Sequence, residues 1–395
     1  MKKWLLMVML VLVPAMASAT EVKYGNGFQI INDDETFKLK VTGRFQPRFE
    51  YTRKETGVRN VGTFKVRRAD VNFKATIHKI LSLGLGLKHS TNSKNFSTLN
   101  IAGGTMTYQA YPEFGVTVGM VGLPLDILTE TSSSWYLLPE PGITATQSDD
   151  ATPFTTTRDS FSVPDGLGVN IAGDISKFFY SLSVVNGAES NYAPNPGMKF
   201  STGARMGVNI LGAVGGSMSD FEQSSDPQLT VSIGGMYQGR RTDDAFATAR
   251  NEAMGVSNSV APDLKYIATG SGGVALRYAG FALTSEAYFR NTKFSSFGNI
   301  PVQLQRSSLS DFGYYAALGY YLLPKMLEAA LQAGQIFRQG PDNNANQIGG
   351  GLNWYIFDNN LKIQLAYTWT QDYDDIVGTA NNNVHNVVLQ VHTMF

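Results

Sequence analysis

The sequence predicts an all-β chain that crosses a membrane as an antiparallel β-barrel of about 16 strands, with one inward-folded constriction loop. The 395 residues include 40 glycines, 18 tyrosines and 23 phenylalanines, but only 16% are charged, a composition typical of strands joined by tight turns. Apolar and polar residues alternate with a period of two, and short connections alternate with long ones. These observations together predict the barrel.

Residues 1–19 are predicted to be a cleavable signal peptide. Lys2 and Lys3 give a positive start, an apolar stretch follows from Trp4 to Ala15, and Ala17-Ser18-Ala19 is a small-residue cleavage site. The apolar stretch is shorter than the roughly 20 residues of a spanning helix, and residues 20–395 contain no apolar run of that length. We therefore expect residues 20–395 to be exported and to form the barrel.

Six segments show the alternation plainly. In residues 37–51 the odd positions are mostly apolar and the even ones are mostly Lys, Arg, Thr, Gln or Glu. The apolar side of all six contains no Asp, Glu, Lys or Arg, as expected where strands face lipid. A soluble β-sandwich also has an uncharged inner face, but its strands are usually about 5 or 6 residues long. The six segments are 37–51, 264–278, 281–289, 310–322, 327–337 and 361–369.

Weaker alternation predicts ten further strands and the turns between them. An apolar phase switch near Arg67-Arg68 indicates a bulge or an overlapping loop. Short connections at 78–80, 111–113, 279–280, 323–326 and 357–360 alternate with longer polar ones, except that 211–228 is long where a short turn is expected. The ten segments are 63–77, 81–90, 100–110, 114–121, 166–172, 177–185, 200–210, 229–240, 347–356 and 384–395.

If the uncharged face meets lipid, the other face must line the lumen. Basic residues outnumber acidic ones on that face, although the whole chain has 32 of each sign. Rings of basic side chains concentrate anions, so this face predicts anion preference; the alternative is that Lys and Arg merely fill a polar wall. The acidic residues predicted inside are Glu50, Asp70, Glu286, Asp311 and Glu328. The basic residues predicted to line the pore and bind anions are Lys38, Lys40, Arg44, Arg48, Lys74, Lys88, Arg205, Arg240, Lys265, Arg277, Arg290 and Lys362.

Several stretches resemble the phosphate-selective porin O and P family. They are VTGRFQPRFE at 41–50, FKVRRADVNFK at 64–74, residues 118–124, the region from 351 to 368, and the closing residues 386–395. Each motif is short, and the resemblance lies in their order and spacing over most of residues 20–395. It implies a sixteen-stranded porin, usually trimeric, in the outer membrane of a Gram-negative bacterium, surrounded by lipid and lipopolysaccharide. Such a porin forms a water-filled channel for passive diffusion of small hydrophilic solutes, here anions such as phosphate.

The terminal Phe395 also carries a resemblance. It follows Val387, Leu389 and Val391, which lie on the same face of the last predicted strand. This pattern resembles the signal that the barrel-assembly machinery recognises in barrel proteins. A place in the aromatic girdle at the membrane interface is compatible with that role.

The longest predicted connection, residues 122–164, follows the fifth strand, where this family and general porins fold a loop into the channel. A loop of this length is usually functional. It carries Asp126, Glu130, Glu140 and Asp159 among its acids against the single basic Arg158. An acidic constriction facing a basic wall would set up a transverse field rather than an anion trap. We therefore keep the anion preference that the basic wall predicts, whereas phosphate selectivity is only an option. Arg158 and Asp159 could also form a local ion pair.

No motif of an enzyme or cofactor site is present. The four histidines are scattered, the chain has no cysteine, and no G-x-S-x-G, H-E-x-x-H, P-loop or nucleotide fingerprint occurs in the sequence. We therefore expect no catalytic residue, cofactor, metal site or nucleic-acid partner. Two alternatives to a channel stay open: a structural or adhesive barrel with a plugged lumen, and a soluble β-protein. Wide lumens accompany about 16 strands, which favours the channel.

Overall fold

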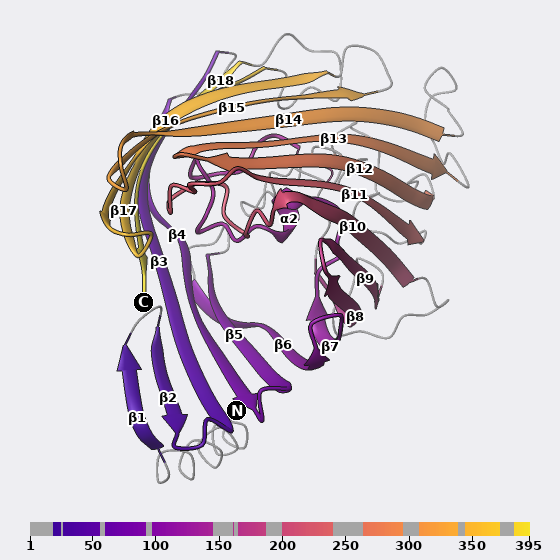
Figure 1. The fold of residues 1–395 in the computed structure, drawn as a ribbon. Coiled ribbons are helices and arrows are strands. Elements are labelled where there is room, and N and C mark those ends of the chain that lie inside the picture. The colour runs from indigo at the N-terminus through magenta and orange to yellow at the C-terminus, as the bar shows by residue number, and fades with distance from the viewer. Residues whose placement is uncertain are drawn as a thin grey trace.

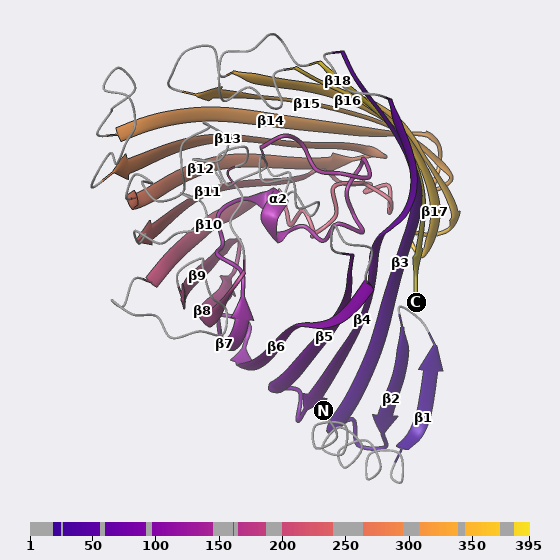
Figure 2. The same ribbon diagram turned by 180° about the vertical axis from the view of Figure 1, so that it is seen from behind.

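The chain forms one antiparallel sheet that closes on itself. A computed structural model of the protein describes residues 19–24, 27–55, 60–91, 97–144, 161, 165–186, 200–239, 264–294, 308–338, 344–371 and 383–395. Each strand from β3 to β18 pairs with the next along the chain, and β18 pairs with β3. These sixteen strands make the closed ring seen in Figures 1 and 2, which confirms the predicted antiparallel barrel of about 16 strands.

The barrel strands coincide with the sixteen predicted segments and are mostly a few residues longer. They are β3 (Phe37–Lys54), β4 (Val61–Ile77), β5 (Leu81–Thr91), β6 (Ser97–Tyr111), β7 (Phe114–Val121), β8 (Gly166–Ile175), β9 (Phe178–Asn186), β10 (Phe200–Gly212), β11 (Gln228–Gly239), β12 (Leu264–Tyr278), β13 (Phe281–Phe294), β14 (Ser308–Leu323), β15 (Leu327–Arg338), β16 (Ala345–Phe357), β17 (Leu361–Gln371) and β18 (Val384–Met394).

A hairpin before the barrel was not predicted from the sequence. It consists of β1 (Ala19–Tyr24) and β2 (Phe28–Asn32). β2 pairs with residues 38–41 of β3, whereas β18 pairs with β3 from Arg44 to Lys54. The hairpin therefore occupies the part of the β3 edge that β18 leaves uncovered. Residues 1–18 of the predicted signal peptide lie outside the described residues, so that prediction stays untested.

The two faces of the sheet differ as the alternation predicts. In β14, Asp311 and Tyr315 are buried, while their neighbours Phe312 and Tyr314 are 44% and 41% exposed. Large exposed apolar side chains recur along the other strands on the same face as Phe312 and Tyr314. In a membrane barrel this is the face that lipid covers. We call the opposite side the polar face, because the buried charged side chains of the strands, such as Arg48, Arg205 and Glu286, lie on it.

The short connections are tight turns. Tyr278 pairs with Phe281 across the two-residue turn Ala279-Gly280, in which φ is +50° and +83°. Positive φ at both central residues is the geometry that matches the twist of a two-residue hairpin. The described residues include one short helix, α2 (Ile127–Glu130), and none of their helices is long and apolar enough to cross a membrane.

Candidate functional site

Residues 122–144, which follow β7, are bound to the polar face of distant strands. Asn353 of β16 donates a hydrogen bond to the Leu137 carbonyl at 2.8 Å, and Lys362 of β17 donates to the Ser134 carbonyl at 3.0 Å. Ser271 of β12 donates to the Leu125 carbonyl. Through these bonds the chain after β7 reaches strands nearly half the barrel away. We call residues 122–144 the inner segment; residues 145–160 and 162–164 of the predicted loop lie outside the described residues.

Two carboxylates hold the start of α2 within the inner segment. Asp126 caps the helix and accepts from the Thr129 amide at 2.6 Å, as short polar side chains do at this position. Glu286 of β13 accepts hydrogen bonds from the amides of the first two helical residues, Ile127 at 2.5 Å and Leu128 at 3.2 Å. Burial raises the pKa of Asp126. These acids therefore satisfy backbone donors and do not face open solvent.

A β-bulge turns two consecutive arginines of β4 to one side. Gln46 of β3 pairs with Arg68, but the next residue, Pro47, pairs with Val66, so Arg67 is the extra residue. In a regular strand neighbouring side chains point to opposite faces. The bulge allows both guanidinium groups to reach Glu140 of the inner segment, which confirms the bulge interpretation of the phase switch.

Glu140 is surrounded by three guanidinium groups. Its carboxylate accepts from Arg67 at 2.6 and 3.1 Å and from Arg48 at 2.5 Å, and lies 3.5 Å from Arg68. Arg48 also contacts Glu50 at 2.7 Å. Burial alone would raise the pKa of Glu140, but the three arginines outweigh it and hold the pKa well below its usual value. Glu140 therefore stays ionised in an arginine cluster, which we define as Arg48, Arg67 and Arg68.

The other predicted arginines of the polar face also have partners. Arg44 binds Asp70 at 2.5 and 2.9 Å and donates to Ser133 of the inner segment at 2.6 Å. Arg205 pairs with Glu130, and its guanidinium lies 5.1 Å from the centre of the Phe179 ring.

Arg290 and Arg277 lie in β13 and β12. Arg290 binds Asp311 at 2.7 and 3.1 Å and lies 4.9 Å from the ring centre of Phe161. Arg277 is 3% exposed and donates to the backbone carbonyls of Leu276 and Ser217, so it organises chain segments.

The lysines of β3, β4 and β5 form a different group. Lys38 and Lys40 are half-buried, and Lys74 and Lys88 are exposed. Lys40 lies directly opposite Lys74 in the β3–β4 ladder, an arrangement that costs free energy through repulsion. None of the four forms an ion pair with another described residue. We call Lys38, Lys40, Lys74 and Lys88 the lysine track; Lys265 of β12 is also exposed.

The structure thus separates the predicted basic residues by environment. The arginines are anchored to acids or carbonyls, Lys362 is 1% exposed, and the lysine track is accessible. Arg240, Arg158 and Asp159 lie outside the described residues. Sequence reasoning missed Arg67 as a contact of the loop, since strict alternation assigns it to the opposite face from Arg68; the phase switch was the available signal.

Comparisons with known proteins agree with this architecture. The family model described as phosphate-selective porin O and P matches residues 39–395. A search of curated proteins finds no significant match. Among solved structures, an anion-selective porin from Comamonas acidovorans superposes with a TM-score of 0.58 at 10% identity, covering 91% of this chain and 100% of that chain.

Two further structures show the same fold. OmpF from Salmonella typhi, in complex with daunomycin, has a TM-score of 0.57 at 13% identity over 95% of this chain and 100% of that chain. The trimer form of OmpT from Vibrio cholerae has a TM-score of 0.56 at 10% identity over 91% and 100%. The family and the fold are those of an outer-membrane channel rather than an enzyme. The chain therefore belongs to the phosphate-selective porin O and P family.

Proposed function

We propose that the protein is a passive, anion-preferring channel for small hydrophilic solutes, with the polar face as its lumen wall and the inner segment as its constriction. The observation that carries this proposal is a difference in pairing. The described acids of the inner segment are engaged by arginines or backbone amides, whereas the lysine track has no ion pair with a described residue.

The charge balance explains why an acidic loop is compatible with anion preference. Glu140 and Glu130 each contact guanidinium groups, so their negative charge is cancelled at short range. Asp126 is buried and its pKa is raised, which favours its neutral form. The accessible lysines then dominate the field in the passage, and a field focused by low-dielectric walls raises the local concentration of anions.

Phosphate is the oxyanion to test first. Guanidinium groups bind oxyanions through paired N–H donors, and three of them converge on one carboxylate at the arginine cluster. In the structure the Glu140 carboxylate occupies the N–H donors of the arginine cluster. A phosphate ion must therefore compete with Glu140 for these donors, and this competition decides how strongly phosphate binds.

The assembly and partners proposed here rest on the family and on the exposed apolar face. OmpT from Vibrio cholerae has a trimer form, and we propose a homotrimer for this chain too. The exposed aromatic and aliphatic residues would contact lipid and lipopolysaccharide. Phe395 would serve the barrel-assembly machinery. Phe395→Ala should then reduce outer-membrane yield in cells, whereas Phe178→Ala, another exposed aromatic, should not.

A reversal-potential measurement tests the proposal. Purified protein is inserted in a planar bilayer under a KCl gradient, and phosphate is then added. A potential showing chloride preference, with phosphate reducing chloride current, is the expected result. Cation preference would contradict the proposed selectivity.

A plugged structural or adhesive barrel is the second candidate, favoured by one observation. Leu128, Leu137 and Leu138 of the inner segment are fully buried against Tyr315 and other barrel residues. Apolar packing of this kind could close a lumen. The same bilayer experiment separates the candidates, because a plugged barrel would insert without measurable conductance.

A further inference from the structure

The connection between β10 and β11, residues 213–227, is the long turn that alternation leaves unexplained. Successive connections of an antiparallel barrel lie at alternate ends, so this stretch begins at the end opposite the loop after β7. Residues 213–216, which are mostly exposed, lead through the half-buried Ser217 into the buried stretch Met218 to Phe221. Because its middle is buried, this connection must fold back against the barrel instead of extending into solvent.

Polar contacts anchor this stretch to the polar face and to a neighbouring turn. Asp220 accepts from the Gly280 amide at 2.7 Å and from the Ser224 hydroxyl at 2.7 Å. The Ser219 hydroxyl lies 2.9 Å from the Tyr321 hydroxyl of β14. Arg277 of β12 donates to the Ser217 carbonyl. These bonds fix Ser217, Ser219 and Asp220 against β12, β14 and the turn between β12 and β13.

Aromatic packing extends the contact to β16. The ring of Phe221 lies 5.3 Å from that of Tyr355 and 6.2 Å from that of Tyr321, centre to centre. The Lys325 ammonium, in the turn between β14 and β15, lies 5.4 Å from the centre of the Phe221 ring. Aromatic pairs at these distances stabilise a contact beyond the effect of the area that they bury.

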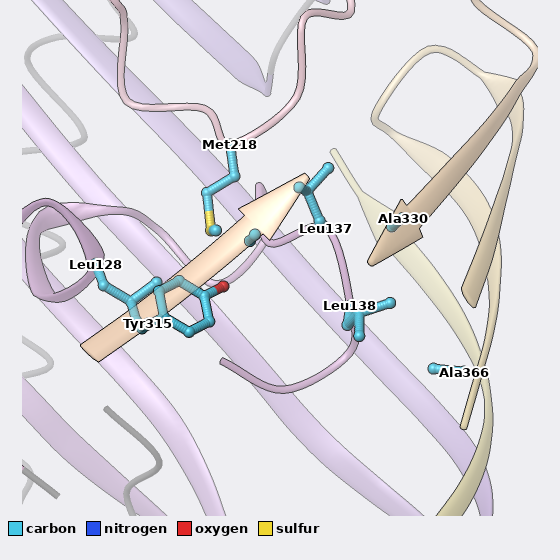
Figure 3. Close-up of a cluster of buried hydrophobic side chains, with 8 residues drawn as sticks. Leu128, Leu137, Leu138, Met218, Tyr315, Ala330 and Ala366 are labelled. Atoms are coloured by element: carbon cyan, nitrogen blue, oxygen red, sulfur yellow. The ribbon is translucent and has the colours of Figure 1, made fainter. Parts of the chain in front are cut away.

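The stretch also contacts the inner segment directly. The Met218 amide donates to the Trp135 carbonyl at 3.2 Å. The Met218 side chain is 2% exposed and packs in one cluster with Leu128, Leu137 and Tyr315. Figure 3 shows Met218 on a separate segment of the chain, with its side chain directed toward Tyr315 and the leucines of the inner segment. Two connections from opposite ends of the barrel therefore meet in one apolar cluster.

We propose that residues 213–227 are a second pore-narrowing element, which sets the solute size limit together with the inner segment and holds that segment in place. This inference rests on the proposed channel function. Residues 213–227 cover the polar face of β12, β14 and β16 at their own end of the barrel, and the inner segment covers the same face farther along. A solute would pass both in series.

Replacing residues 213–228 with Asn-Gly tests the proposal. Gly212 pairs with Leu229, so two residues suffice to join them as a tight hairpin. We expect single-channel conductance in KCl to rise roughly twofold and larger neutral polymers to enter the pore, since the narrowest section of a channel limits its current. Gly215→Ala is the matched control, because a Cβ at Gly215 would meet no atom within 4 Å.

Unchanged conductance and an unchanged polymer size limit in a folded replacement variant would overturn the inference while leaving the channel function intact. A silent wild type with a conducting replacement variant would refute both, because a pore that is closed in the wild type has no solute size limit for residues 213–227 to set. Two silent proteins would refute both. If the replacement variant does not fold, Met218→Ala and Asp220→Ala decide: raised conductance supports the inference, and wild-type conductance in both overturns it.

Discussion

Removing the negative charge of Glu140 should strengthen anion preference. Glu140→Gln keeps the shape of the side chain but leaves the arginine cluster with one acid fewer. A unit charge acts on an ion 4 Å away with about 1 kcal/mol at the dielectric constant of water. Local chloride should therefore rise about fivefold, and potassium should fall by a similar factor, at that distance.

Distance and salt reduce this effect. The screening length is about 10 Å at 0.1 M salt and about 3 Å at 1 M. We therefore expect the chloride-to-potassium permeability ratio of Glu140→Gln to rise about threefold or more at 0.1 M KCl and much less at 1 M. The assay is the reversal potential under a fixed KCl gradient at both concentrations.

The matched control is Glu35→Gln, which makes the same charge change in an exposed ion pair with Lys79. It should leave the ratio unchanged. Breaking a buried ion pair can cost about 3–5 kcal/mol, so barrel formation in the Glu140 variant is checked first by circular dichroism. A folded Glu140→Gln channel with the wild-type ratio would show that Glu140 does not influence permeating ions, and the reasoning above would be refuted.

Three further outcomes follow from the described contacts. Lys40→Glu should pair with Lys74 across the ladder, lower the anion preference in reversal potentials, and stabilise the sheet by about 0.2–1 kcal/mol in urea unfolding. Gly234→Ala should displace the inner segment and raise conductance, because its Cβ would clash with the carbonyl oxygen of Leu125, whereas Gly272→Ala, with open space around it, should not. Since the folded pKa of Glu140 is lowered, its stabilising contribution should be complete above the unfolded value near 4.5 and be lost as pH falls below it, measured as unfolding midpoints against pH. An unfolding midpoint that falls equally in Glu140→Gln would contradict this last expectation.

Much of the barrel could be predicted from sequence because lipid imposes a simple rule. Lipid-facing positions in the middle of a strand exclude charge, so alternation identifies strand, face and phase at once, as in Leu361 to Trp369. The hairpin β1–β2 escaped prediction since five or six residues give too few alternations to stand out. Alternation also offers no account of residues 213–227, whose burial depends on tertiary contacts of Met218 and Phe221.

The candidate site was predictable only in its composition. Alternation selected Arg48 and the lysine track, but it carries no information on which charges are paired. The contact between Glu140 and three guanidinium groups depends on the path of the inner segment and on the bulge at Arg67. The sequence alone predicts that the acidic loop and the basic wall face each other across the pore. In the fold, Glu130 and Glu140 of the loop instead form ion pairs with arginines of the wall.

The seam between β18 and β3 has a consequence for how the protein folds. It joins side chains 346 positions apart, as in the 2.7 Å contact of Gln46 with His392. Bringing together the ends of so long a chain costs roughly 5 kcal/mol of configurational entropy by the logarithmic scaling law. That cost is repaid only when the seam forms as a whole, so closure should be cooperative and late. Until then the edge of β3 is open to pairing with another chain, and β2 shields residues 38–41 from that hazard.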